Sequence, residues 1–168
     1  MHPAVIRPEQ PADAAAIHAV HAASFPTAAE ARLVDLLRAA GRLAVSVVAE
    51  SGGVVVGHVA FSPVTVASGS IGAGLGPVAV GEADRRRGLG ERLIREGLAA
   101  CRAAGFAWAV VLGEPEYYRR FGFRPAADFG LSDEFDGGAA FQVLELVPGG
   151  LPVGAGLVRY AEEFASLA

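Results

Sequence analysis

The sequence predicts an α/β fold built around one mixed β-sheet, and two patterns lead to this prediction. Residues 43–50 and 54–66 are rich in β-branched side chains and are joined by a Ser-Gly-Gly turn at 51–53, which is typical of a hairpin. Later in the chain, the apolar segments 75–80 and 106–112 flank a helical pattern. Hairpin strands followed by a strand–helix–strand unit predict a sheet of mixed type.

The composition favours one folded domain over residues 1–168. Of the 168 residues, 52% are hydrophobic and 19% are charged, so the chain can bury a core of its own. All 14 basic residues are arginine, which excludes a lysine Schiff base and the lysine of a P-loop. Cys101 is the only cysteine, which excludes an internal disulfide and a cysteine metal cluster.

The charge and hydropathy of the chain also limit its partners. No apolar run approaches the length of a membrane span, and residues 1–7 lack the pattern of a secretory signal, so we expect a cytoplasmic protein without a membrane partner. The net charge of −4 argues against nucleic acid as the main partner. The oligomeric state stays open, a homodimer being the commonest oligomer.

The first part of the chain predicts a short strand and two helices. Residues 4–7 read as the strand, and Asp13 is placed to cap a helix that runs to about residue 23. Thr27-Ala28-Ala29-Glu30 has the spacing of a capping box for a second helix, and Gly41 is placed to end it. The apolar residues of this second helix recur at helical spacing: Leu33, Leu36, Leu37 and Ala40.

The remaining elements follow the hairpin. Residues 67–74 predict a turn, and Pro77 predicts a bulge in the strand at 75–80, because proline cannot donate a ladder hydrogen bond. A helix of about four turns should end at Gly105, with its buried stripe at Leu89, Leu93, Gly97 and Cys101. A short helix at 116–121 and strands at 139–146 and 157–160 complete the prediction.

An arginine- and glycine-rich turn joins the strand at 75–80 to this helix. It reads Arg85-Arg86-Arg87-Gly88-Leu89-Gly90. The first N–H groups of a helix have no internal partner, and glycine lets backbone approach a ligand closely, so such a junction can bind a phosphate. A solvated loop is the alternative interpretation. Arginine at the positive end of a helix is unfavourable unless an anion is bound, which favours a ligand.

This turn resembles the central motif of the GNAT superfamily of N-acetyltransferases, which is Arg or Gln, two residues, Gly, one residue, then Gly or Ala. Arg85, Gly88 and Gly90 occupy those positions. The preceding strand at 75–80 and the opening of the chain at 5–13 also resemble the family. A later segment, Tyr117-Tyr118-Arg119-Arg120-Phe121-Gly122-Phe123, resembles its tyrosine motif.

The resemblance implies a single-domain GNAT fold whose central sheet is splayed open between its fourth and fifth strands and flanked by helices. It implies acetyl-CoA as cosubstrate and no metal. Pantetheine would pair with the backbone of Val78, Ala79 and Val80, and the N–H groups of residues 86–90 would hold the pyrophosphate. The cofactor-binding set is therefore Val78, Ala79, Val80, Arg85, Arg86, Arg87, Gly88, Leu89, Gly90 and Tyr118. Many members carry Asn after the second strand, where this chain has Gly113.

The resemblance also implies roles in catalysis. The backbone N–H of Val80 would polarise the thioester carbonyl. Tyr118 lies four residues before Gly122, where the general acid of the family usually lies, and it would protonate or hydrogen-bond the leaving thiolate, with a pKa lowered by a nearby arginine as one route. For Tyr117 we favour packing.

The general base is not identified by the sequence. Glu30 lies where the resemblance places the acceptor, although a capping box would explain it without catalysis. His58, Glu82 and Glu114 are further candidates, and His58 reads as a core or edge residue. We expect Cys101 to be inert packing. His18 and His21 share a helix face without an acidic partner at ligand spacing, and we expect both at the solvent or the helix edge.

The predicted function is acetyl transfer to a primary amine, of a small molecule or a peptide, directly within a ternary complex. A non-catalytic acyl-CoA-binding or sensing module is the alternative. Transfer to the amino group of a charged tRNA is a third hypothesis, which the acidic composition disfavours.

Overall fold

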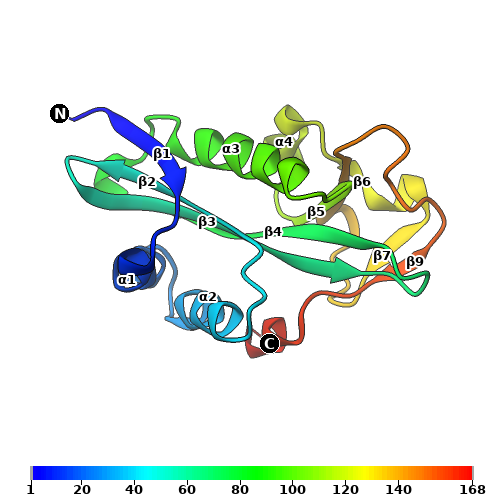
Figure 1. The fold of residues 1–168 in the computed structure, drawn as a ribbon. Coiled ribbons are helices and arrows are strands. Elements are labelled where there is room, and N and C mark those ends of the chain that lie inside the picture. Colours follow the sequence, from blue (N-terminus) through cyan, green and yellow to red (C-terminus); the bar gives the residue numbers. More distant parts are fainter. Residues whose placement is uncertain (1, 168) are drawn as a thin grey trace.

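A seven-stranded mixed β-sheet forms the centre of the computed structural model, which describes residues 2–167 (Figure 1). Neighbouring strands are antiparallel except for β4 and β5, which are parallel, so the predicted mixed sheet is confirmed. In spatial order the strands are β1 (Ala4–Pro8), β2 (Val45–Ser51), β3 (Val54–Thr65), β4 (Ile71–Val80), β5 (Trp108–Leu112), β8 (Phe141–Glu145) and β6 (Arg124–Pro125).

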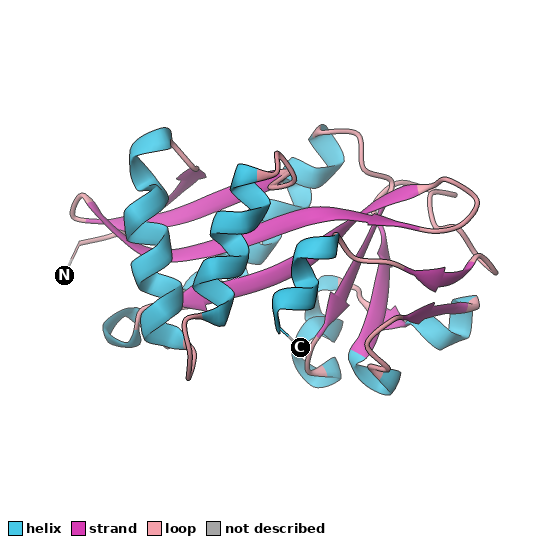
Figure 2. Cartoon of the chain, turned by 90° about the horizontal axis from the view of Figure 1, so that it is seen from below, coloured by secondary structure: helices cyan, strands magenta, loops and turns pink. Residues whose placement is uncertain are grey.

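Helices cover both faces of this sheet. Figure 1 shows α3 (Leu89–Ala103) on one face, with α1 (Ala14–Ser24) and α2 (Ala29–Ala39) on the other. Figure 2, seen from the α1–α2 side, shows these two helices lying next to each other across the strands. The short helix α4 (Pro115–Tyr118) follows β5 directly. Within residues 2–167, no helix is both long and apolar enough to span a membrane.

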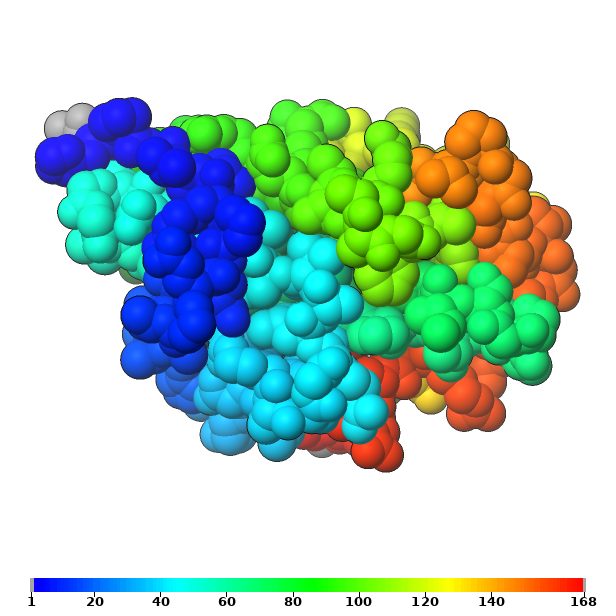
Figure 3. Space-filling view, in the orientation of Figure 1, coloured from blue at the N-terminus to red at the C-terminus, as the bar shows by residue number. Residues whose placement is uncertain are grey.

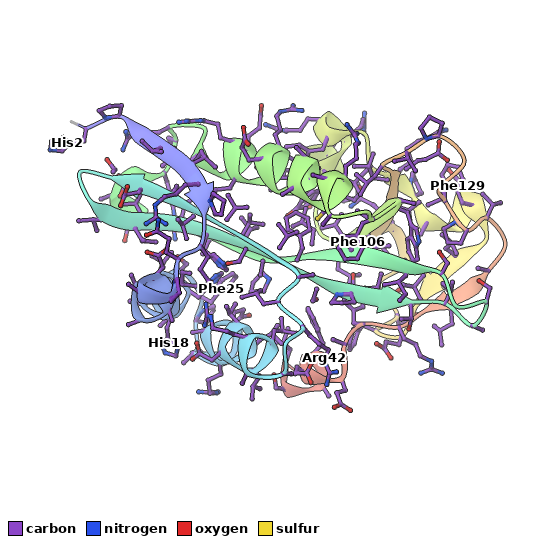
Figure 4. All side chains as sticks on the ribbon, in the orientation of Figure 1. His2, His18, Phe25, Arg42, Phe106 and Phe129 are labelled. Atoms are coloured by element: carbon purple, nitrogen blue, oxygen red, sulfur yellow. The ribbon has the colours of Figure 1, made fainter. Side chains whose placement is uncertain are left out.

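A second, two-stranded parallel sheet is formed by the C-terminal part of the chain. It pairs β7 (Leu131–Asp133) with β9 (Gly156–Val158). The sequence predicted a strand near β9 but missed β7. A final 3₁₀ helix, Glu162–Leu167, packs beside α2, as the space-filling view also shows (Figure 3). Arg42, which follows α2, holds this 3₁₀ helix in place: its Nε lies 2.7 Å from Oε1 of Glu163 (Figure 4).

The start of α2 differs from the prediction. The helix begins at Ala29 with Ala28 at the N-cap, and the hydroxyl of Thr27 accepts the N–H of Ala29 at 3.2 Å. The predicted capping box is therefore wrong, because the hydroxyl bonds two residues ahead instead of three. The carboxylate of Glu30 makes no hydrogen bond to another residue within 2–167, so capping does not account for this side chain. Leu36, expected in the apolar stripe, is 45% exposed.

The fourth strand is longer than the sequence predicted. It begins at Ile71, four residues before the predicted start, within a segment that reads as a turn because it is rich in glycine. Gly72 is required by packing: a Cβ there would lie 2.5 Å from the buried indole of Trp108. The predicted bulge is confirmed at Gly76 and Pro77, because the pairing with β3 shifts register between Val59 and Phe61.

The contact between α3 and the sheet depends on Gly97. The α3 stripe of Leu89, Leu93, Gly97 and Cys101 is buried, as predicted. A Cβ at Gly97 would overlap the ring of Phe61, which is fully buried on β3. Cys101 is fully buried in this stripe, and burial raises the pKa of its thiol to about 12, which agrees with the expected packing role.

Replacing Gly97 with valine is expected to destabilise the protein by about 1–3 kcal/mol, because the new side chain must displace Phe61 from a close-packed core. Ala99→Val on the exposed face of α3 is the matched control, and it should cost no more than about 0.5 kcal/mol. Urea unfolding of both variants measures the difference. An equal loss of unfolding free energy in the two variants would show that α3 tolerates a side chain at the contact with Phe61.

Candidate active site

The sheet opens between β4 and β5. The two parallel strands pair only at Ala73–Ala109, Gly74–Val110 and Leu75–Val111. Beyond Leu75, β4 continues to Val80 with pairing to β3 alone, while β5 continues with pairing to β8. The predicted splay between the fourth and fifth strands is therefore confirmed.

The open edge of β4 presents backbone groups from Val78 and Val80. The N–H of Gly81 donates to the carbonyl of Val56 at 2.8 Å, and hydrogen-bonded pairs alternate along antiparallel strands. Val78 and Val80 consequently direct their N–H and C=O groups away from β3, towards the opening. The Val80 carbonyl already accepts the guanidinium Nε of Arg85 at 2.9 Å.

The backbone at the start of α3 offers a row of free donors beside this edge. None of the N–H groups of residues 86–91 donates a hydrogen bond to another residue within 2–167. Arg86 has φ 65° and Gly88 has φ 73°, a left-handed geometry that non-glycine residues adopt at a cost. Convergent free amides at a helix start, on a strained turn, form a binding site for an anion.

The three arginines of the turn differ in their contacts. Arg85 is bonded to Val80, as above. Arg87 pairs with Asp84 at 2.9 Å and donates to the carbonyl of His2 at 2.9 Å. The side chain of Arg86 has no ion pair or hydrogen bond within the described chain. Arg86 is consequently the arginine that is ready to bind a phosphate without first breaking a contact.

A cavity of about 420 Å³ lies at the opening, on the α1–α2 side of the sheet. Its floor is the bulged part of β4, from Leu75 to Val78, and Tyr118 and Leu112 contribute from the β5 side. The other lining residues are Phe25, Glu30, Leu33, Phe135, Tyr160, Phe164 and Leu167. Figure 4 shows Phe25 between the α1–α2 layer and the sheet.

Tyr118 and Tyr117 have different environments. Tyr118 is buried at the cavity, and burial raises the pKa of its hydroxyl to about 12, so the route through a pKa lowered by arginine is wrong. Its ring packs on Gly113, where any Cβ would overlap it, which explains why this chain has glycine at that position. Tyr117 packs under Arg120, as expected for packing, although its hydroxyl lies beside Gly90.

Of the four groups considered as bases, only Glu30 lines the cavity. Glu82 and Glu114 are exposed elsewhere. His58 is fully buried under α1, where its Nδ1 lies 2.8 Å from Nε2 of His21. The expectation that His21 faces solvent is wrong, whereas His18 is partly exposed and pairs with Asp35 (Figure 4).

The buried histidine pair belongs to a hydrogen-bonded chain with a fixed direction. The hydroxyl of Ser46 donates to Glu9 at 2.7 Å, so it must accept from Nε2 of His58, which lies at 2.8 Å. His58 then accepts at Nδ1 from the Nε2–H of His21. Both imidazoles are neutral, because burial lowers the pKa of each, to about 4 for His21. Nδ1 of His21 is buried, and no hydrogen-bond partner reaches it from the described residues 2–167.

The sequence could not reveal several residues of the cavity wall. Phe25, Phe135, Tyr160 and Phe164 carry no local motif, and they meet only because β9 and the last 3₁₀ helix return to α2. Within residues 2–167, no group of three or more His, Cys, Asp or Glu side chains is arranged to hold a metal ion.

An open strand edge beside a row of free amides is suited to a long ligand that carries both amides and phosphates. A mixed sheet with such a site indicates the class of protein to which the chain belongs. The chain matches the acetyltransferase (GNAT) domain over residues 5–126. It therefore belongs to the GNAT family of acetyltransferases.

Two relatives from Escherichia coli K12 support the assignment. The uncharacterized N-acetyltransferase YhbS is 43% identical over 163 residues, covering 95% of this chain and 98% of the relative. The uncharacterized N-acetyltransferase YjhQ is 36% identical over 121 residues, covering 68% of this chain and 66% of the relative.

Solved structures agree in fold. YhbS from Escherichia coli, in complex with CoA, has a TM-score of 0.93 and 42% identity, covering 98% of this chain and 93% of its own. A GNAT acetyltransferase from Brucella melitensis, in complex with acetyl-CoA, has a TM-score of 0.81 and 42% identity. The match covers 98% of this chain and 99% of the Brucella chain.

Proposed function

We propose that this protein transfers the acetyl group of acetyl-CoA to a primary amine, directly within a ternary complex. The observation that carries the proposal is the opening between β4 and β5 beside the free amides of residues 86–91. The residues present fit the cosubstrate: Val78 and the N–H of Val80 offer a strand edge for amides, and the N–H groups of residues 86–91 with Arg86 offer donors for phosphates. The CoA and acetyl-CoA complexes of the two similar structures support the same assignment.

Each group at the opening has a role in the transfer. Bound acetyl-CoA would supply a thioester, whose carbonyl carbon the amine nitrogen attacks. The outward N–H of Val80 is placed to stabilise the negative charge that develops on the carbonyl oxygen. When the carbon–sulfur bond breaks, the hydroxyl of Tyr118 hydrogen-bonds the thiolate. The attacking neutral amine loses one proton and the departing thiolate gains one, so the products are an amide and a thiol.

We propose that Glu30 binds the acceptor as its ammonium and does not act as the direct base. Moving a proton from an alkylammonium to a glutamate is uphill by roughly 8 kcal/mol at reference pKa values. Glu30 has no partner of its own within the described chain and lines the cavity. Its carboxylate can therefore attract the cation, while the ammonium releases its proton to bulk solvent through the open cavity, which is uphill by roughly 5 kcal/mol at pH 7.

We also propose that residues 1–168 act as one catalytic domain. The match to the family ends at residue 126. Tyr160, Phe164 and Leu167 nevertheless line the same cavity as Tyr118. A truncation after β6 would remove that wall.

Acetyl-CoA at one hundred times its dissociation constant is expected to stabilise the protein by about 2.7 kcal/mol, which a thermal shift would detect. Release of free thiol across a panel of primary amines then measures the transfer. Binding without release for any amine would favour the non-catalytic acyl-CoA-binding module.

Gly88→Val is expected to weaken acetyl-CoA binding by about tenfold or more, because a branched side chain disturbs the left-handed turn that aims the amides. Gly41→Val is the matched control, since Gly41 has φ 72° at the end of α2, away from the turn. Both variants should lose about 1–2 kcal/mol of stability from the same backbone strain. Calorimetric titration measures the affinity. Equal affinity in both variants would show that the turn does not hold the cosubstrate.

A further inference from the structure

One wall of the cavity is aromatic and is centred on Tyr160, whose ring packs on Gly74 of β4. The Tyr160 ring lies 5.0 Å from that of Phe164 and 5.6 Å from that of Phe135, between ring centroids. Phe25 and Leu33 complete the wall from α1 and α2. Most of this surface is apolar, so a ligand gains free energy there by burying apolar groups.

The loop that carries Phe135 is held in place. The carboxylate of Asp133 accepts the N–H of Phe135 at 3.1 Å and that of Gly137 at 2.9 Å. Glu134 accepts the N–H of Tyr160 at 2.8 Å, which ties the loop to the wall. Phe135 is 42% exposed although it is a large apolar side chain. A fixed, exposed aromatic ring at a cavity is a preformed contact for a ligand.

The charge on the residues that line the cavity is negative. Glu30 is the only charged residue among those that line it, within residues 2–167. The chain has 14 arginines, yet none of those described lines the cavity. A ligand there meets one carboxylate and no cation.

We infer that the acceptor is a primary monoamine on an apolar body, with its ammonium drawn to Glu30 and its body packed on Phe135, Tyr160 and Phe164. This inference rests on the proposed function and names its substrate class. An anionic acceptor would bury a carboxylate or phosphate without a cationic partner. A diamine would bring a second ammonium with no second carboxylate to pair it.

Three amines of equal chain length test the inference, because they differ only at the far end. Pentylamine ends in a methyl group, α,ω-diaminopentane in an ammonium, and ω-aminopentanoate in a carboxylate. At saturating acetyl-CoA, kcat/KM for pentylamine is expected to exceed that of the other two by about tenfold or more. Phenethylamine should be at least as good a substrate as pentylamine, because its ring can pack on the aromatic wall.

Two variants test whether Glu30 and Phe135 cause the preference among these amines. Glu30→Gln is expected to lower kcat/KM for pentylamine by about tenfold, chiefly through KM, by removing a charged partner of the ammonium. Phe135→Ala should remove any advantage of phenethylamine over pentylamine while acetyl-CoA affinity stays at the wild-type value. Glu96→Gln, on the exposed face of α3 across the sheet, is the matched control and should leave all rates unchanged.

The outcomes separate this inference from the proposed function. Turnover of the diamine or the amino acid as fast as pentylamine, or wild-type rates in Glu30→Gln, would overturn the acceptor class and leave the acetyltransferase standing. Thiol release with none of the amines would overturn the proposed function. Calorimetric binding of phenethylamine and diaminopentane to the CoA-bound protein would then decide the acceptor class, and tighter binding of the diamine would refute it.

Discussion

Tyr118→Phe is expected to lower kcat by about 10²–10⁴-fold, the usual contribution of a general acid. The variant keeps the ring that packs on Gly113 and loses only the hydroxyl. Acetyl-CoA affinity should stay within about tenfold of wild type, because one neutral hydrogen bond contributes about 1 kcal/mol. Stopped assays of thiol release and calorimetric titration measure the two quantities.

The raised pKa of Tyr118 defines how the hydroxyl acts. With a pKa of about 12, full proton transfer to a thiolate of ordinary pKa is uphill by roughly 5 kcal/mol. Hydrogen bonding to the developing thiolate is consequently its first contribution. Because the phenol stays protonated through the neutral range, the pH–rate profile of the wild type should show no fall from tyrosine ionisation below about pH 10.

Tyr117→Phe is the matched control, since it removes a hydroxyl one residue away. Tyr117 does not line the cavity, so the kcat of Tyr117→Phe should remain within about tenfold of wild type. Wild-type turnover in Tyr118→Phe would exclude Tyr118 as the acid. A wild-type protein that binds acetyl-CoA but acetylates no amine would instead identify a sensing module.

The free energy of unfolding is expected to fall by about 3 kcal/mol or more between pH 7 and pH 4, because His21 and His58 are buried as neutral groups. Burial, together with repulsion from the neighbouring His18, lowers the folded-state pKa of His21 to about 4. The pKa of His58 is lowered too, chiefly by burial and then by repulsion from a protonated His21 and from Arg38. Urea unfolding across this pH range measures the slope.

The direction follows from proton uptake. Both folded-state pKa values lie below the unfolded value of 6.5, so only the unfolded chain gains protons as the pH falls from about 6.5. Stability is therefore complete above pH 6.5 and declines towards pH 4. The paired carboxylate of Asp13, whose pKa Arg7 lowers from 3.8, loses its contribution at a lower pH, so the two effects occupy different ranges.

A double variant, His21→Leu with His58→Leu, should lose most of this slope, because both partners of the buried hydrogen bond become apolar together. His18→Gln is the control: His18 is partly exposed on the same helix, and its variant should keep the slope. A slope that survives in the double variant would assign the acid sensitivity to other groups.

The strand, turn and helix proposed to bind the cosubstrate were predictable from the sequence because their signals are local. A strand, a turn with free amides and a helix are consecutive in the chain, so Val80, Gly88 and Gly90 follow from one short motif. The bulge at Pro77 was also predictable, since proline removes a donor wherever it lies.

The aromatic wall of the cavity, which we propose to bind the acceptor, could not be predicted from the sequence, for a physical reason. Tyr160 and Phe25 are far apart in sequence, and each reads locally as an ordinary apolar residue. His21 was misplaced because its partner His58 lies on a different element, and burial of a polar ring depends on that partner. The early start of β4 was missed because Gly72 follows a turn-like pattern, whereas its real constraint is the indole of Trp108.

The two parts of the candidate site also come from different stretches of the chain. The strand edge and amide turn lie between residues 71 and 91, whereas Phe135, Tyr160 and Phe164 come from the last third. Under the proposed function, substitutions in that last third would alter which amine is chosen and leave the residues proposed to handle the thioester intact. The proposal therefore expects acceptor preference to diverge among relatives without a change in chemistry, and grafting residues 131–167 between them to exchange it.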